Sequence, residues 1–408
     1  LDASFAALGD GVGARAALVG ELTGGDADVF ALSLSAGQTA SVAVRGLSGN
    51  ATAVELLAPS GDRLAYGIAS PTNVDQAVTD FVATASGTYT VRVTGESGSY
   101  NLAVMRDAAF GLETSGEQDL TTSGAVLGYL ESGETDGYRL GLVAGQAFTA
   151  DTWTPGDGPN RFHNALNPKL ELYDASGALV ASNDDRSPGD VNATLTYTAS
   201  SDGEYVLKGV SSDGSWGEYY LSASGHSAVQ PAFEVVSTDP SDGAFLPHVP
   251  GSITVQFNDI VLLNTLSASD LVMDGSQPAT AVHYVSSDTV RFDLPPLAEG
   301  PHTISLADAA VSDLQGTGSS AFGAGFEIDL TPPNLTYSSI AEGDVLTTGD
   351  LTYTAIFDEP LGSDDLGVDD VSLAGAETGE HSLDAIGFDP ATRTLTVTYT
   401  GLPEDSYV

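Results

Sequence analysis

The sequence predicts an all-β protein built as a tandem of β-sandwiches. Apolar and polar residues alternate in short runs, and Gly, Asn, Asp, Ser and Pro interrupt these runs every ~8–12 residues, a pattern typical of sandwiches. Helical periodicity is nearly absent from a chain that contains 47 glycines and only two methionines. At roughly 100–200 residues per domain, 408 residues predict two to four domains.

Residues 1–107 form the first predicted unit. Its turns carry residues that suit tight turns, such as the proline, glycine and aspartate of segment 58–62. In segment 87–94, Tyr89 alternates with Val91 and Val93, which predicts one apolar face. The candidate strands are 16–22, 28–34, 39–45, 53–57, 76–83, 87–94 and 99–105.

Residues 108–230 repeat this order. The acidic turn and strand of 24–34 return at 133–142, so that Asp136 follows Asp28 by 108 positions. Later segments match at an offset of 116, which places an inserted loop within 151–168. A repeat of this kind identifies one structural unit used twice.

This two-copy unit resembles the bacterial pre-peptidase C-terminal domain over residues 14–105 and 122–224. The resemblance rests on the acidic turns before Phe30 and Tyr138, the Ala-Gly-Gln turns, the Leu-x-Asp/Pro-x-Ser-Gly segments and the Gly-x-Tyr-x-Val/Leu strands. It implies jelly-roll-like sandwiches of the kind found beside secreted proteases and in surface proteins.

Residues 231–330 have a different pattern, with a proline-glycine turn at 237–243, a strand pattern at 253–259 and the segment Val-Ser-Asp-Leu-Gln-Gly at 311–316. This order resembles bacterial Ig-like domains of surface-layer proteins and adhesins, and residues 331–408 form a second copy. Gly343 follows Gly243 by 100 positions, and the motif at 357–359 follows 257–259 by the same offset. The second copy stops before its last strand, which would expose an open sheet edge. We expect a truncation at the C-terminal end; a strand supplied by a neighbouring chain is the alternative.

Charge and composition exclude several classes of function. The formal net charge of −44 is unsuited to nucleic acid or to anionic membranes. It favours bound divalent cations, a salty medium or simple solubility. Without cysteine the chain has neither disulfides nor thiolate metal sites. No segment is apolar enough to span a membrane, and the N-terminus lacks a signal segment, so we expect an internal or processed fragment.

The sequence carries none of the common catalytic motifs, and we predict that the chain is not an enzyme. It has no His-Glu-x-x-His, no Gly-x-Ser-x-Gly, no phosphate-binding glycine loop and no cysteine nucleophile. The six histidines are scattered without metal-ligand spacing. Paired carboxylates are too common in so acidic a chain to indicate a glycosidase.

Calcium is the cofactor that the acidic turns favour, because Ca²⁺ takes six to eight oxygen ligands in flexible loops. An Asx-turn that caps the strand entry is the alternative for the first pair of aspartates. Three groups are candidates: the repeated acidic turns, the Asn-Asp-Asp turn of the second unit, and the junction before Pro332. The candidate ligands are Asp26, Asp28, Asp136, Asn183, Asp184, Asp185, Asp190, Asp313, Glu327 and Asp329.

The resemblances sharpen two of these groups. In domains similar to the second unit, an Asn-Asp-Asp run often binds calcium, which implies a site at Asp184 and Asp185; the first copy lacks these carboxylates at 64–67. In tandem adhesin repeats, an Asp before Thr-x-Pro shares an ion with the preceding domain, which implies a site at Asp329 and Asp313.

Exposed aromatic rings would indicate a glycan or protein ligand, and both tryptophans fall in the second unit. Trp153 lies in the inserted loop and Trp216 in a glycine-serine turn. Packing of these rings over the end of the sandwich is the alternative.

The most consistent function is a calcium-stiffened structural or assembly segment of a large bacterial secreted or cell-surface protein. Its partners would be neighbouring copies of itself, other surface proteins, or a glycan or protein ligand. An accessory region of a secreted protease or hydrolase, and a glycan- or protein-binding adhesin module, are the alternatives.

Overall fold

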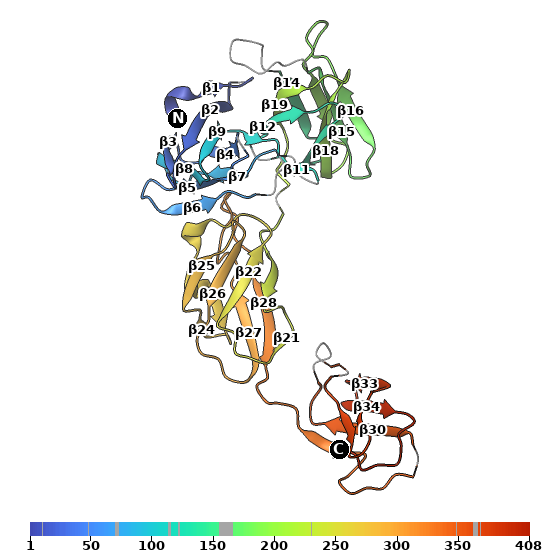
Figure 1. Ribbon diagram of the computed structural model, residues 1–408. Helices are drawn as coiled ribbons and strands as arrows, with labels where there is room; N and C mark the ends of the chain where they lie inside the picture. The colour runs from blue at the N-terminus through green and yellow to red at the C-terminus, as the bar shows by residue number, and fades with distance from the viewer. Residues whose placement is uncertain are drawn as a thin grey trace. The chain divides into compact units, whose positions relative to one another are not determined.

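The computed structural model describes the chain except for residues 10, 48, 70–72, 113–115, 121–122, 155–165, 230, 348, 362–365 and 368. Its described residues form β-strands and three short 3₁₀ helices, η1 (Asp2–Ser4), η2 (Leu263–Thr265) and η3 (Ala268–Asp270), so the predicted all-β class is confirmed. None of these helices has the length and apolar character of a membrane span. The chain divides into two compact units, Leu1–Ile328 and Asp329–Val408 (Figure 1).

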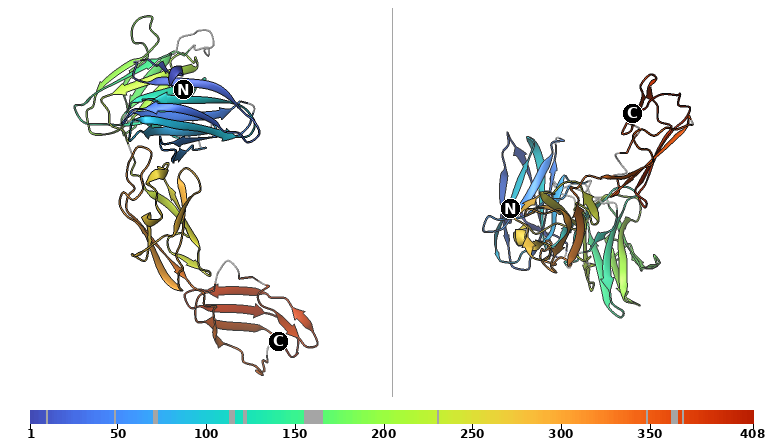
Figure 2. Two further views of the ribbon diagram at one scale, coloured as in Figure 1. Left: turned by 90° about the vertical axis from the view of Figure 1, so that its left-hand side faces the viewer. Right: turned by 90° about the horizontal axis from the view of Figure 1, so that it is seen from below.

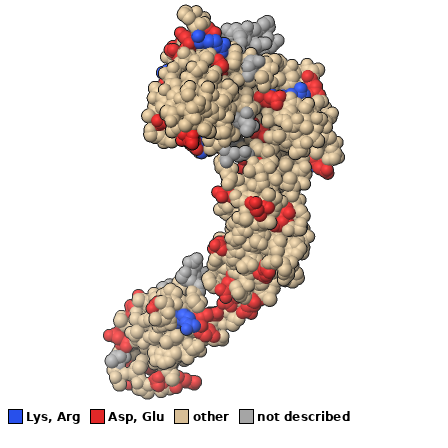
Figure 3. Space-filling view, turned by 180° about the vertical axis from the view of Figure 1, so that it is seen from behind, with Lys and Arg blue, Asp and Glu red and all other residues tan. Residues whose placement is uncertain are grey.

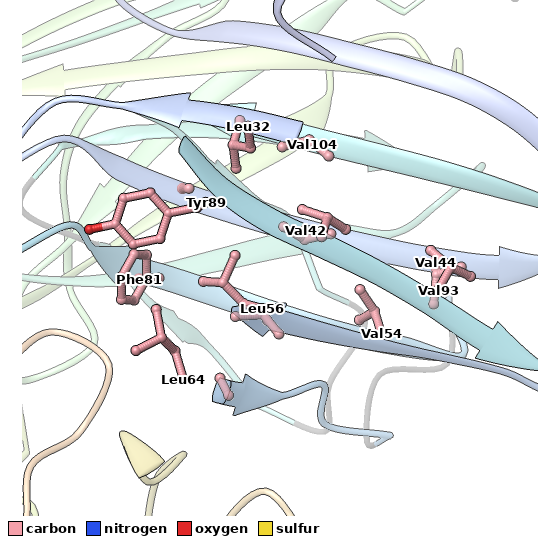
Figure 4. Packing of buried hydrophobic residues seen from close by; sticks show 14 of the residues in the cluster. Leu32, Val42, Val44, Val54, Leu56, Leu64, Phe81, Tyr89, Val93 and Val104 are labelled. Carbon is pink, nitrogen blue, oxygen red and sulfur yellow. The ribbon is translucent and has the colours of Figure 1, made fainter. Parts of the chain in front are cut away.

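The first sandwich packs two sheets against each other. Tyr89, Val91 and Val93 are at most 2% exposed, as their alternation predicted, and the two sheets enclose them with the leucines and valines of Figure 4. One sheet has the order β1 (Ala6–Ala7), β2 (Ala14–Leu22), β9 (Gly98–Arg106), β4 (Thr39–Gly46), β7 (Gln76–Val82), and the other β3 (Asp28–Leu34), β8 (Gly87–Gly95), β5 (Thr52–Leu57), β6 (Arg63–Tyr66).

All seven strands predicted for this unit are present within two residues of their expected ends. The strand β6 was not predicted. It has four residues, of which Leu64 and Ala65 are both buried, so it shows no alternation that a sequence pattern would reveal.

The second sandwich repeats the strand order of the first. The order β2-β9-β4-β7 recurs as β12-β19-β14-β17, and β3-β8-β5-β6 recurs as β13-β18-β15-β16. Of the predicted inserted loop, 155–165 lie outside the described residues. The strands are β10 (Ala109–Phe110), β11 (Gln118–Asp119), β12 (Ala125–Leu130), β13 (Thr135–Leu142), β14 (Ala147–Trp153), β15 (Pro168–Tyr173), β16 (Leu179–Asn183), β17 (Thr194–Thr198), β18 (Gly203–Ser211) and β19 (Gly217–Ser224).

A tyrosine ring lies over a glycine on the neighbouring strand in both sandwiches. Tyr100 on β9 faces Gly20 on β2, and Tyr219 on β19 faces Gly128 on β12. A Cβ atom at Gly20 would lie 2.3 Å from the Tyr100 ring, and one at Gly128 would lie 2.6 Å from the Tyr219 ring. Glycine at these positions gives each ring the space to enter the core.

The third sandwich has its own core, in which Phe233 stacks on Phe257. Its strand β21 pairs with β28 in parallel. One sheet has the order β20 (Val235–Asp239), β22 (Ser252–Phe257), β26 (Thr289–Asp293), β25 (Ala281–Tyr284), and the other β21 (Ala244–Leu246), β28 (Phe322–Ile328), β27 (Gly300–Leu306), β23 (Leu271–Met273), β24 (Gln277–Pro278).

The second unit, Asp329–Val408, repeats the first of these sheets as β29-β30-β34-β33, whose strands lie side by side in Figure 2. The hairpin β31-β32 corresponds to β23-β24, and Tyr407 bridges to Gly375 beside it. Its buried core consists of Ala355, Leu395, Val397 and Tyr399. The strands are β29 (Leu335–Ser338), β30 (Leu351–Phe357), β31 (Leu373–Gly375), β32 (Gly379–His381), β33 (Ala385–Asp389) and β34 (Thr394–Tyr399).

The glycine beneath Tyr219 gives a stability prediction. In Gly128→Ala, the new methyl group collides with the ring, and we expect a loss of about 1–3 kcal/mol in the free energy of unfolding. Urea denaturation measures this change. Gly251→Ala is the control, since nothing lies within 4 Å of its Cβ position, and equal effects of the two substitutions would contradict the packing argument.

Candidate functional site at the sandwich junctions

The aspartates of the repeated acidic turns accept hydrogen bonds from tyrosines across the sandwich. Asp28 on β3 accepts a hydrogen bond of 2.5 Å from the Tyr100 hydroxyl, which comes from the opposite sheet. Asp26 is exposed, and its Oδ1 accepts a hydrogen bond of 2.7 Å from the Ala27 N–H. One candidate ligand of this turn is therefore engaged within the fold, and the other faces solvent.

In the second sandwich the same bond is extended by one hydroxyl. Asp136 on β13 accepts a hydrogen bond of 2.5 Å from Tyr219, and the hydroxyl oxygens of Tyr219 and Tyr138 are 2.6 Å apart. Both tyrosines are 1% exposed. Burial raises the pKa of Asp136 to about 6, while the Tyr219 hydrogen bond opposes that rise. Phe30 holds the place of Tyr138 in the first copy, so its network has one hydroxyl fewer.

An arginine directly follows the Asn-Asp-Asp turn and pairs with carboxylates outside it. The Arg186 guanidinium is 3.7 Å from Asp190 and 3.9 Å from Asp151, and it packs 4.9 Å from the centre of the Trp153 ring. It also donates a hydrogen bond of 2.7 Å to the Thr152 carbonyl. Arg186 therefore supplies positive charge within this segment, a role that the sequence analysis missed.

The other members of that turn differ in their contacts. The Asn183 Oδ1 accepts a hydrogen bond of 2.9 Å from the Thr194 N–H. Asp184 is exposed and accepts one of 3.2 Å from Ser212, while Asp185 is exposed to solvent. Asp184 and Asp185 are thus the candidate ligands of this turn that remain accessible.

The structure does not bring Asp313 and Glu327 together. Asp313 lies before β28, where its Oδ1 accepts hydrogen bonds from the N–H groups of Gln315 and Thr317 at 3.0 and 2.7 Å. Glu327 lies near the other end of β28, about 16 Å beyond Phe322 at the rise of a β-strand.

Asp329 belongs to the second unit and accepts a hydrogen bond of 3.0 Å from the Thr331 N–H. Considering only the described residues, no group of three or more histidines, aspartates and glutamates is placed to hold a metal ion.

The two predicted aromatic ligand residues have different surroundings. Trp153 is partly buried beside Tyr220, with ring centres 5.9 Å apart, in the apolar cluster between the first two sandwiches. Trp216 is 45% exposed and lies 6.5 Å from the Tyr129 ring, which is 41% exposed. Of the two predicted residues, Trp216 is the one that presents its ring to solvent, together with the neighbouring Tyr129.

The first and second sandwiches share a buried apolar contact. Ala43, Ala77 and Met105 of the first sandwich pack with Leu127 and Tyr220 of the second, and all five are at most 7% exposed. This contact continues the cores of both sandwiches across their boundary, which favours a fixed arrangement of the two.

The first and third sandwiches also meet, although they are not neighbours in sequence. Ile260, Leu262 and Leu314 of the third sandwich join the core cluster of the first and are at most 5% exposed. The Val82 N–H donates a hydrogen bond of 3.0 Å to the Leu314 carbonyl. The Gln315 side-chain amide donates one of 3.4 Å to the Asp80 carbonyl. We call this contact the first–third junction.

An aromatic stack extends the first–third junction. Tyr66 on β6 and Tyr284 on β25 stack with ring centres 3.7 Å apart and planes 16° from parallel. The Arg63 guanidinium lies 4.5 Å from the centre of the Tyr66 ring, and it is 3.3 Å from the buried Glu55. The unpredicted strand β6 therefore provides one side of this stack.

Carboxyl groups with raised pKa values lie at the first–third junction. Burial and the charge of Asp259 raise the pKa of Asp80 to about 7. Burial, followed by the charges of Asp313 and Asp119, raises the pKa of Asp259 to about 6. No sequence signal distinguished Asp80, and Asp259 stood only in the 257–259 motif that aligned residues 231–330 with 331–408.

One family comparison concerns the first sandwich. Residues 26–95 match the bacterial pre-peptidase C-terminal domain. The predicted resemblance is thereby confirmed for this segment, which contains Asp26, Asp28 and most strands of the first sandwich. No curated protein matches the chain.

Similar solved structures include CopC from Methylosinus trichosporium OB3b, with 13% identity, a TM-score of 0.19, and coverage of 24% of this chain and 93% of that one. The N-terminal part of the bacterial S-layer protein SbsC has 13% identity and a TM-score of 0.20, covering 31% and 41%. SGBP-B of Bacteroides ovatus, in complex with a mixed-linkage heptasaccharide, has 14% identity and a TM-score of 0.19, covering 58% and 60%. At TM-scores this low the likeness does not bear on function.

The two tyrosine networks provide matched variants. Tyr219→Phe removes the hydrogen bond to Asp136 and leaves the buried Tyr138 hydroxyl without its Tyr219 partner, so we expect a loss of about 1–3 kcal/mol in stability. Tyr100→Phe removes one bond to a partly exposed aspartate, and we expect a smaller loss. Urea denaturation of both variants measures the difference. A larger loss in Tyr100→Phe would disprove this account of the extra hydroxyl.

Proposed function

We propose that this chain is a non-catalytic extracellular structural segment of a bacterial secreted or surface protein, in which the first three sandwiches act as one rigid body. The observation that carries the proposal is the first–third junction, where Tyr66 stacks on Tyr284 and residues of the third sandwich join the core of the first. Apolar burial of this kind opposes the free domain motion that is the default for tandem domains.

The charge distribution supports an extracellular spacer rather than a binder of polyanions. Acidic side chains are spread over the face seen in Figure 3, and basic ones are few. Of the 12 basic residues, at least eight lie within 4 Å of a carboxylate of this chain. Little positive charge is left for phosphate groups, and the excess negative charge keeps copies of the chain apart in solution.

Calorimetry of the full chain at pH 5 tests the rigid body. We expect the first and third sandwiches to unfold in one transition, and Tyr284→Ala to split or broaden it because the stack contributes about 0.5–1.5 kcal/mol. Tyr337→Ala, a 53% exposed tyrosine of the second unit, is the control and should leave that transition unchanged. Separate transitions in the unaltered protein, or no response to Tyr284→Ala, would rule out the rigid-body proposal.

Binding of a glycan or protein is the second candidate function, and the exposed pair of Trp216 and Tyr129 favours it. Adjacent exposed rings are suited to stacking on a sugar or on a partner's apolar side chains. An accessory role beside a secreted hydrolase is a further alternative, which the pre-peptidase match of residues 26–95 supports. A catalytic domain elsewhere in the same reading frame would favour that role.

Calcium enters this proposal through Asp184 and Asp185, the exposed carboxylates of the second sandwich. If they hold Ca²⁺, the free energy of unfolding rises by RT ln(1 + [L]/Kd). The melting temperature then rises with free calcium and falls on chelation. The double variant Asp184→Asn, Asp185→Asn should lose this response, whereas Asp308→Asn, at an exposed aspartate of the third sandwich, should keep it. Equal melting temperatures with calcium and with EGTA would exclude stiffening by calcium.

A further inference from the structure

We propose that the first–third junction is a proton-controlled lock, which closes when Asp80 is protonated and opens when Asp80 is ionised. The device goes beyond a static spacer, because it makes the arrangement of the sandwiches depend on the acidity of the medium. It rests on hydrogen-bond geometry at Asp80 and on the kinds of group that surround it.

One carboxyl oxygen of Asp80 has no hydrogen-bond donor among the described residues. It lies on β7 with a φ of 54°, and its N–H donates a hydrogen bond of 2.9 Å to the Ser41 hydroxyl. Its Oδ1 is shielded from solvent and accepts no hydrogen bond from the described residues. The Gln315 Oε1, on the other side of the junction, is shielded in the same way and also lacks a donor. Leaving such groups unsatisfied is unfavourable.

A proton corrects this mismatch. The amide of Gln315 already donates to the Asp80 carbonyl, so the two residues are in contact. Ionised, Asp80 offers only acceptors, and its Oδ1 finds no donor among the described residues; protonated, its carboxyl group gains an O–H donor. Protonation therefore removes a buried charge and supplies a donor in the same step.

The charge that faces Asp80 also favours its protonated state. Burial and the charge of Asp259, from the third sandwich, raise the pKa of Asp80, and the hydrogen bond with Ser41, from β4, opposes that rise. Asp259 in turn faces Asp313 and Asp119.

The basic residue beside Asp119 is already paired. Arg139 forms an ion pair of 2.8 Å with Asp119, which also faces Glu204. No cation is among the groups that shift the pKa of Asp80. Asp80 and Asp259 thus place acidic groups on both sides of the junction.

The sign of the pH dependence follows from these groups. The pKa of Asp80 is about 7 when the junction is closed and about 3.8 when the carboxyl is in water. The closed form binds the proton more tightly, so closure is fully favoured below pH 4 and loses this support as the pH rises through 7. Between pH 5 and pH 8 the ratio of closed to open molecules falls by up to about 100-fold from this group alone.

Single-molecule energy transfer in the full chain tests the lock. The protein has no cysteine, so dyes can be attached at Thr23→Cys in the first sandwich and Ser276→Cys in the third, both exposed. Measurements at pH 5 and pH 8 contain EGTA, so that metal ions do not contribute. We expect one narrow distribution at pH 5 and a second, open population at pH 8.

Two variants and a control separate the lock from general acid effects. Asp80→Asn is neutral at every pH, keeps a donor and tolerates the positive φ, so we expect it to stay closed at both pH values. Asp259→Asn removes the facing charge and should move the opening midpoint to lower pH. Asp308→Asn is exposed and should behave as the unaltered chain.

Two results would overturn the proposal. Identical distributions at pH 5 and pH 8 in the unaltered chain would exclude a proton-controlled junction. An Asp80→Asn protein that still opens between these pH values would assign the response to another group. Circular dichroism at both pH values confirms that each variant is folded, and Asp259→Asn provides the same test if Asp80→Asn does not fold.

Discussion

The hydrogen bond between a tyrosine hydroxyl and an aspartate on the opposite sheet is the interaction on which the first two sandwiches depend. Each ring passes over a glycine, crosses the core and meets the carboxylate of the acidic turn. Three distant positions therefore have to match. The glycine leaves space for the ring, the tyrosine hydroxyl donates a hydrogen bond, and the aspartate carboxylate accepts it. Their coupling explains why the acidic turn occurs in both copies.

The strands and the repeat could be predicted because both are local properties. Alternation such as that of Tyr89, Val91 and Val93 is imposed by the strand itself. The strand β6 lacks alternation and could not be found in this way. The role of Asp28 was equally hidden, because its partner Tyr100 lies 72 positions away and nothing in the acidic turn refers to it. Asp28, which resembled a metal ligand in the sequence, thus accepts a hydrogen bond within the fold.

The junctions were the least predictable part of the candidate site. Asp80, Ile260 and Leu314 come from separate segments, and each has the sequence character of an ordinary strand end or turn. Only the folded chain reveals that they meet. The contacts of Arg186 were hidden for a related reason, because its partners Asp151 and Asp190 lie in different segments of a chain with 56 acidic residues.

The contact between the first and third sandwiches also changes how the chain would carry tension. A pull applied at the N-terminus and at the end of β28 can pass directly from the first sandwich to the third through the tyrosine stack and the shared core. The second sandwich and the segment that follows it are then bypassed, and they take up load only after that contact has sheared.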